Sequence, residues 1–221
     1  MNKISIIAAM LCVTFAFSQN NKYNKFSIET AYGLNHPLSP KVNSGAGAGV
    51  LDDLDAGDFS EFKHFDIGGR YMVNQLYGFK FSYAYDRFQY DATSLAINYN
   101  RVGVEAVINF DKLFNISFNR QRSFQIQAHT GVGITFAKPK RKGNTEKIGN
   151  LMIGITPLFK VTDRIAITTD LSYIVNFKQH YDYGGTNIDP NKKDSVTGGF
   201  VNFTIGLNFS IGDSRSHADW Y

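Results

Sequence analysis

Residues 76–88 read Leu-Tyr-Gly-Phe-Lys-Phe-Ser-Tyr-Ala-Tyr-Asp-Arg-Phe, with an aromatic residue at nearly every second position. Successive side chains of a β-strand point to opposite faces, so an extended chain separates this stretch into two unlike faces. One face carries Tyr77, Phe79, Phe81, Tyr83 and Tyr85, and the other carries Gly78, Lys80, Ser82, Ala84 and Asp86. A strand with lipid on one side and a narrow polar interior on the other needs this arrangement.

The same alternation recurs along the rest of the chain. Seven further runs show it, at 26–34, 62–71, 99–110, 124–136, 151–159, 165–177 and 199–211. Most reach the roughly nine to eleven residues that a tilted strand needs to cross a bilayer. The connections alternate between long (36–61, 87–97, 137–148, 182–197) and shorter (72–75, 111–122, 161–164). The pattern predicts an all-β fold, an eight-stranded antiparallel up-and-down transmembrane β-barrel with its long loops outside the cell and both termini in the periplasm.

A soluble, lipocalin-like cup is the alternative fold. Such a cup has an apolar inner face for its ligand and a polar outer face. In this chain the aromatic face is nearly unbroken over the eight runs, and the other face is rich in Gly, Ala and Ser. Small residues suit the interior of an eight-stranded barrel, which side chains can fill. The membrane barrel is therefore preferred.

Bulk composition agrees with a strand-built membrane protein. The chain has 221 residues, 14% of them aromatic, and a formal net charge of +4, with a mean hydropathy of −0.23. In a transmembrane barrel only alternate residues are apolar, so a low average hydropathy is expected. No basic stripe with interleaved aromatics is present in the sequence, so we expect no nucleic-acid partner.

The N-terminus has the features of a secretory signal peptide. Lys3 precedes an apolar run, Ile4 to Phe17, and Ala16-Phe17-Ser18 offers a cleavage site. Cys12, the single cysteine, lies inside this segment, so the mature chain is expected to have no disulfide, metal thiolate or thiol chemistry. No other metal or cofactor is expected. We predict a signal peptide at 1–18, a barrel at 19–212, a short periplasmic tail at 213–221, and export to the outer membrane.

Three local features qualify the strand prediction. His36-Pro37 is expected to end the first strand, and Pro157 predicts a strand end or a bulge because proline cannot donate a ladder hydrogen bond. The apolar residues of 111–122 sit near helical spacing, which indicates a segment lying at the membrane interface. The acidic stretch 52–58 resembles a calcium loop, but Gly57 stands where an oxygen ligand is required, so a solvated loop is expected.

Several stretches resemble OmpA-family outer membrane proteins of the Bacteroidetes type. They are 149–157 (Gly-Asn-Leu-Met-Ile-Gly-Ile-Thr-Pro), 171–174 (Leu-Ser-Tyr-Ile), 179–181 (Gln-His-Tyr) and the terminal 217–221 (His-Ala-Asp-Trp-Tyr). The resemblance implies the N-terminal barrel of that family. There, this point leads into a periplasmic linker and a peptidoglycan-binding domain, whereas the sequence stops at Tyr221. Peptidoglycan is therefore not an expected partner of this chain alone.

Charged residues on the small-residue faces should point into the barrel. Buried charges persist only when paired, so one interpretation is a self-satisfying network that fills the interior. The other is a narrow gated pore. We prefer the network, because eight strands leave little open volume. The predicted interior charges are Glu29, Asp66, Arg70, Lys80, Asp86, Arg101, Glu105, Asp170 and Lys178.

Two further functions stay open as alternatives to a structural envelope role with surface loops. A small outer-membrane enzyme would draw on His36, His64, His129 or His180 with Ser39, Ser44 or Ser94, but no spacing among these is diagnostic. We expect no enzyme, and expect His129 and His180 to be interior hydrogen-bonding residues. A loop-based adhesin is the second alternative. The expected partners of a monomeric barrel are outer-membrane lipid and lipopolysaccharide. One interpretation of the basic loop is that it contacts lipopolysaccharide phosphates through Lys138, Lys140, Arg141 and Lys142; the other, which we prefer, is a solvated loop.

Overall fold

A computed structural model describes residues 23–39, 61–89, 95–114, 123–140, 143–189 and 195–221. The predicted signal peptide, the acidic stretch 52–58, and Arg141 and Lys142 lie outside these residues. Among the helices in the described ranges, none has the length and apolar character to cross a membrane.

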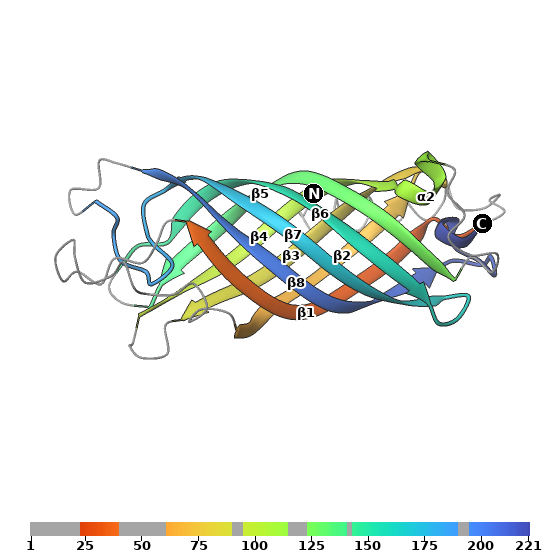
Figure 1. Ribbon diagram of the computed structural model, residues 1–221, viewed down its shortest axis with the longest axis horizontal. Helices are drawn as coiled ribbons and strands as arrows, with labels where there is room; N and C mark the ends of the chain where they lie inside the picture. The colour runs from red at the N-terminus through yellow and green to blue at the C-terminus, as the bar shows by residue number, and fades with distance from the viewer. Residues whose placement is uncertain (1–22, 40–60, 90–94, 115–122, 141–142, 190–194) are drawn as a thin grey trace, which may run out of the picture.

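Eight antiparallel strands close into one barrel, as the sequence predicts (Figure 1). Each strand pairs with its neighbours in the chain, and β8 pairs with β1 from Ile211 opposite Phe26 to Gly199 opposite Ser39. A short helix α2 (Phe110–Leu113) follows β4, and a 3-10 turn η3 (Ala218–Trp220) follows β8. The strands are β1 (Phe26–Ser39), β2 (Glu61–Met72), β3 (Tyr77–Gln89), β4 (Ala96–Asn109), β5 (Phe124–Pro139), β6 (Glu146–Lys160), β7 (Ile165–Gln179) and β8 (Val196–Ile211).

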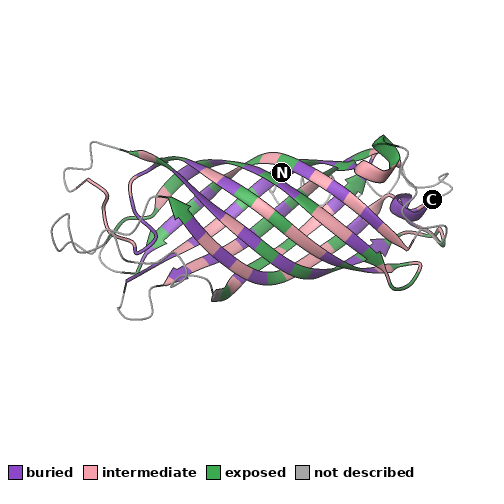
Figure 2. Ribbon diagram, in the orientation of Figure 1, coloured by how far each residue is buried: buried purple, intermediate pink, exposed green. Residues whose placement is uncertain are grey.

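Side chains alternate between the inside and the outside of the barrel, so buried and exposed positions form a chequered pattern along the strands (Figure 2). The outside is apolar on every strand: Phe81 is 63% exposed, Ile205 60% and Val132 57%. Closure gives every strand two paired neighbours, which is the condition for crossing lipid with strands. A continuous band of exposed apolar side chains around a closed barrel is the surface that lipid chains cover.

The two ends of the barrel differ. One end carries the connections 40–60, 90–95, 140–145 and 180–195, and we call it the loop end. The other carries 73–76, 110–123 and 161–164 together with the start of β1 and the end of β8, and we call it the terminal end. The strands extend further toward the loop end than the sequence predicts. As a result, the β4–β5 connection at the terminal end is longer than two of the loop-end connections.

Helix α2 occupies only the start of the segment predicted to lie at the membrane interface. Asn109 caps it by accepting a hydrogen bond from the Lys112 backbone N–H. Its last residue Leu113 and the following Phe114 are 48% and 62% exposed. These two apolar side chains lie at the terminal end in the position expected for an interfacial contact, and residues 115–122 lie outside the described ranges.

Both proline predictions are wrong. Strand β1 continues through Pro37, opposite Phe200 of β8, because its pairing with β2 has already ended at Asn35 and proline is tolerated where one strand edge is unpaired. Strand β6 continues through Pro157, which pairs with Ile126 of β5. On the β7 side the pairing lapses between Ile155 and Leu158 and resumes in the same register. The missing N–H of Pro157 therefore interrupts the β6–β7 pairing locally. It causes neither a bulge nor a strand end.

Lys178 does not point into the barrel, contrary to the prediction. The register of β7 against β8 shifts between Asn176 and Gln179, which is a β-bulge of one extra residue. Lys178 adopts a positive φ of 58°, and Phe177 and Lys178 are both exposed. Gln179 takes the inward position in its place, where its amide donates to the Tyr181 carbonyl at 2.6 Å.

Candidate functional site in the barrel interior

A column of ionisable side chains runs along the inside of the barrel. Eight of the nine predicted interior charges belong to it, supplied by β1, β2, β3, β4 and β7: Glu29, Asp66, Arg70, Lys80, Asp86, Arg101, Glu105 and Asp170. Three histidines and one further carboxylate join them from positions that were not predicted as charges: His64, His129, His217 and Asp219. These groups form four clusters, described in order from the terminal end to the loop end, and Glu29 joins the first two.

Arg70 is the centre of the lowest cluster. Its side chain is 1% exposed, and its two terminal nitrogens donate to both oxygens of Asp219, at 3.1 and 2.7 Å. Its Nε lies 2.7 Å from Glu29, and Gln127 accepts a hydrogen bond from Nη1 at 2.7 Å. This guanidinium therefore contacts two carboxylates, and a buried charge requires such partners.

Asp219 belongs to the segment predicted as a short tail, and this segment folds back into the barrel. His217 Nδ1 lies 2.9 Å from Asp219, and Gln127 donates to the same carboxylate at 3.0 Å. Burial would raise the pKa of Asp219, but the neighbouring charges of Arg70 and His217 outweigh it and hold that pKa well below its ordinary value. The carboxylate therefore stays ionised and anchors the segment.

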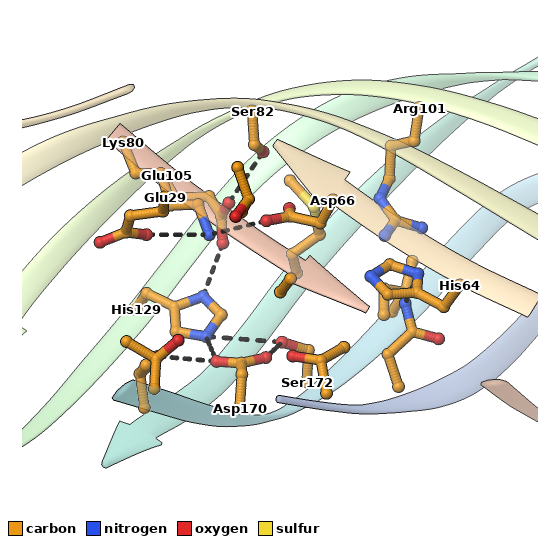
Figure 3. Close-up of a pocket in the computed structure, with 18 residues that line it drawn as sticks. Glu29, His64, Asp66, Lys80, Ser82, Arg101, Glu105, His129, Asp170 and Ser172 are labelled. Carbon is orange, nitrogen blue, oxygen red and sulfur yellow. Dashed lines mark hydrogen bonds and ion pairs between the residues drawn. The ribbon is translucent and has the colours of Figure 1, made fainter. Parts of the chain in front are cut away.

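Lys80 forms the second cluster. Its ammonium lies 3.3 Å from Glu29 and 3.5 Å from Asp66, so Glu29 links it to Arg70 below. Figure 3 shows the three side chains converging from separate strands near the middle of the barrel. The two carboxylates share one ammonium.

His129 lies between two carboxylates in the third cluster (Figure 3). Its Nδ1 is 2.6 Å from Glu105 and its Nε2 is 2.9 Å from Asp170. Gly154 of β6 makes room for the ring, since a Cβ there would lie 2.7 Å from the ring carbon Cε1. Both ring nitrogens face a carboxylate, so the ring bridges β4 to β7 across the interior.

The uppermost cluster joins β2, β3, β4 and β8. Asp86 is fully buried and lies 2.7 Å from His64 and 3.0 Å from Arg101. Asn202 of β8 donates to the same carboxylate at 3.1 Å. The Arg101 guanidinium also sits 5.4 Å from the centre of the Phe200 ring, a cation–π contact that links the charged column to the aromatic residues above.

Aromatic side chains close the loop end. Phe88 of β3 packs at 4.6 Å between ring centroids against Tyr183 from the β7–β8 connection and at 5.1 Å against Phe200. Tyr99 of β4 completes the group at 5.3 Å from Phe88, and all four side chains are 0% exposed. These four rings therefore pack against one another across the described part of the loop end.

Residues 217–220 close the terminal end. His217, Ala218, Asp219 and Trp220 are all buried, and Trp220 packs with Leu158 of β6 and Ala166 of β7. The backbone holds the segment as well, because Ala218 N–H donates to the Asn24 carbonyl at 2.8 Å. Figure 1 shows the C-terminus at this end of the barrel, on the same side as α2.

The space left between the two closures is small. A cavity of about 50 Å³ lies among the middle clusters, lined by Lys80, Glu105, His129, Asp170 and their neighbours. That volume holds a few water molecules and no organic ligand. In the described part of the chain, no group of three or more His, Cys, Asp or Glu side chains is arranged to hold a metal ion.

The chemistry of the column is charge compensation. Three fixed cations face six carboxylates, and each of the three histidines contacts at least one of those carboxylates. Each of the three fixed cations likewise contacts at least one carboxylate. Ser172 is the one serine near a histidine here, but its hydroxyl donates to Asp170 and lies 3.5 Å from His129 Nε2. That geometry ties the hydroxyl to a carboxylate and does not activate it as a nucleophile.

The remaining predicted residues lie at the loop end. His180 was expected inside the barrel, but its side chain is 39% exposed and lies 2.5 Å from Glu146 at the rim. Ser39 and His36 lie at the end of β1, whereas Ser44 and Ser94 lie outside the described residues. Lys138 is exposed near the end of β5, and Lys140 is exposed just beyond that strand.

A closed barrel with an apolar outer band and a polar, side-chain-filled interior is the fold of outer-membrane β-barrel proteins. Solved structures share it. Neisserial surface protein A superposes with a TM-score of 0.51 at 12% identity, covering 84% of this chain and 97% of that one. A major outer membrane protein from Thermus thermophilus gives 0.54 at 10% identity, covering 85% and 98%. The outer membrane protein OprG from Pseudomonas aeruginosa gives 0.52 at 10% identity, covering 89% and 100%.

At these identities the likeness shows the fold. No protein-family model and no curated protein matches the chain.

Proposed function

We propose that this chain is a non-catalytic structural barrel of the outer membrane, exported by its N-terminal signal peptide and inserted as a monomer. The loop end would face the outside of the cell and display the surface loops, and the terminal end would face the periplasm. The shared fold and the apolar band support the membrane location. The position of 40–60 and 180–195 at one end, opposite the start of β1, supports the orientation.

The observation that carries this proposal is the closure of the interior at both ends. The aromatic group of Phe88, Tyr99, Tyr183 and Phe200 closes one end, and residues 217–220 close the other. Between them the charged groups contact one another and leave a cavity of about 50 Å³. A barrel built in this way contributes a rigid wall and a set of loops to the membrane, and the resemblance to OmpA-family barrels agrees with that role.

A deletion strain tests the proposal. Loss of the protein should weaken the envelope, measured as greater sensitivity to detergent, and the wild-type chain should restore resistance. The variant Ser39→Ala/His36→Ala/His180→Ala removes the described serine and histidines at the rim, and it should restore resistance equally. An unaffected deletion strain would contradict the structural role. Loss of rescue by the triple variant, when that variant is folded in the membrane, would favour an outer-membrane enzyme.

A narrow gated pore is the second candidate function. The observation that favours it is the series of charged groups from Asp219 to Asp86, which offers polar partners inside the barrel. Opening would require both closures to move. In that case the conductance would depend on the middle clusters, and Glu105→Ala would abolish it.

A further inference from the structure

Three lysines project outward from neighbouring strands at the loop end. Lys138 lies near the end of β5, Lys147 near the start of β6 and Lys178 near the end of β7, and all three are exposed. Lys147 pairs with Phe136, so Lys138 is its diagonal neighbour on the same face. On the other side Gly149 pairs with Phe177, which places Lys178 beside the start of β6.

These lysines stand at the edge of the lipid-facing band. Phe136 and Phe177, the last apolar side chains of the band on β5 and β7, are 37% and 46% exposed. Each lysine lies within two residues, along the strand or across a strand pair, of one of these rings. The charges therefore occupy the level at which lipid headgroups meet the barrel wall, and we call Lys138, Lys147 and Lys178 the lysine rim.

The bulge in β7 completes the lysine rim. A regular strand would turn Lys178 into the barrel, and the extra residue turns it outward instead. Lys178 is the sole described residue other than glycine with a positive φ, a conformation that is unfavourable for a side chain with a Cβ. Backbone outliers of this kind persist where the surrounding structure and the position of the side chain require them.

The lysine rim lacks acidic partners among the described residues. None of its three members forms an ion pair there, and Glu146, the carboxylate nearest in sequence to Lys147, contacts His180 instead. The terminal end is different, because Lys160 and Arg215 both pair with Asp163, at 2.8 and 2.7 Å. Two cations at the terminal end thus share a carboxylate, whereas no described carboxylate pairs with a member of the lysine rim.

We infer that the lysine rim binds the phosphate groups of lipopolysaccharide in the outer leaflet. The inference rests on the proposed orientation, which places the loop end outside. Lipopolysaccharide carries its phosphates at the headgroup level of that leaflet, where adjacent lysines on a barrel wall meet them directly. Clustered lysines are the side chains that recognise anionic lipid headgroups, through charge and with little demand on geometry.

Lipopolysaccharide binding by the refolded full-length chain tests the inference. The variant Lys138→Gln/Lys147→Gln/Lys178→Gln should bind purified lipopolysaccharide on the order of 100-fold more weakly at low salt, since each lysine near an anionic surface contributes roughly five-fold. The matched control Lys160→Gln/Arg164→Gln/Arg215→Gln removes the same charge from the terminal end and should bind as the wild type does. Dephosphorylated lipopolysaccharide should bind the wild type as weakly as the rim variant binds the intact lipid.

Lys178→Gly separates charge from backbone. Glycine adopts positive φ without strain, so this variant keeps the bulge and the fold, measured by heat-dependent migration on a gel, and should bind about five-fold more weakly. Unchanged binding by the folded triple variant, or equal binding of the dephosphorylated lipid, would overturn the inference. Failure of the proposed function can be distinguished from failure of this inference. Steady conductance or absent rescue of the envelope would contradict the structural role, and the lipopolysaccharide-binding results do not depend on either measurement.

Discussion

His129 illustrates how single residues hold this interior together. Its two ring nitrogens contact Glu105 at 2.6 Å and Asp170 at 2.9 Å. His129→Leu would leave both carboxylates without the group they share. Breaking a buried ion pair costs about 3–5 kcal/mol, and we expect that loss in the free energy of unfolding, measured by urea titration of the barrel in lipid vesicles.

His180→Leu is the matched control for His129. It also removes a histidine–carboxylate contact, but the side chain is 39% exposed at the rim. Exposed pairs contribute about 1 kcal/mol or less, so a small loss is expected. Equal losses for the two variants would show that burial of the His129 contact is unimportant.

Gly154 provides a second test at the residue scale. An added Cβ would lie 2.7 Å from His129 Cε1 and 2.8 Å from the Leu171 carbonyl oxygen. Gly154→Ala should therefore displace the ring and lower the free energy of unfolding by about 1–3 kcal/mol. Gly149→Ala lies on the same strand with nothing within 4 Å of the added Cβ, and it should change that free energy by about 0.5 kcal/mol or less. If Gly154→Ala leaves the free energy of unfolding unchanged, the His129 ring does not need the space beside Gly154.

At the scale of elements, the folded-back segment 213–221 is tested through Trp220. This is the single tryptophan of the chain, so its fluorescence reports docking directly. The folded-state pKa of Asp219 lies below its ordinary value of 3.8, so the stabilisation from its charge is fully present above pH 3.8 and is lost as the pH falls further. The emission should stay constant from pH 7 to about pH 4 and move to longer wavelength below.

Asp219→Ala checks the cause of that change. Removing the carboxylate leaves Arg70 without its bidentate partner, so the segment should undock and the emission should already be shifted at pH 7. Native emission in this variant, or a shift in the wild type between pH 7 and pH 5, would show that Asp219 does not hold the segment.

The elements also show where sequence reasoning stops. Alternation locates every strand, because lipid outside and a filled interior impose a period of two. The alternation gives the wrong face for Lys178, because one inserted residue reverses the inside–outside assignment. The sequence Asn-Phe-Lys-Gln at 176–179 contains no glycine that would indicate the bulge. The Arg70–Asp219 pair joins residues 149 positions apart. No periodicity in residues 213–221 connects them to the barrel.

At the scale of the whole molecule, the fold class and eight of the nine interior charges follow from the sequence. The reason is that alternate residues of each strand face the interior. The pairing of these charges depends on strand register and tilt. The alternation of side chains along a strand determines neither. Two of the three interior histidines, His64 and His217, are not predicted inside. Histidine is both polar and aromatic, so its presence does not indicate which face of a strand it occupies. The contacts of His64 with Asp86 and of His217 with Asp219 therefore emerge only from the structure.

The central claim is that the barrel is closed, and single-channel recording of the refolded wild-type chain in a planar bilayer tests it most directly. With the aromatic group closing the loop end and residues 217–220 closing the terminal end, we predict no steady openings at voltages that leave the bilayer intact. Steady openings in the wild type that Glu105→Ala abolishes would contradict the claim.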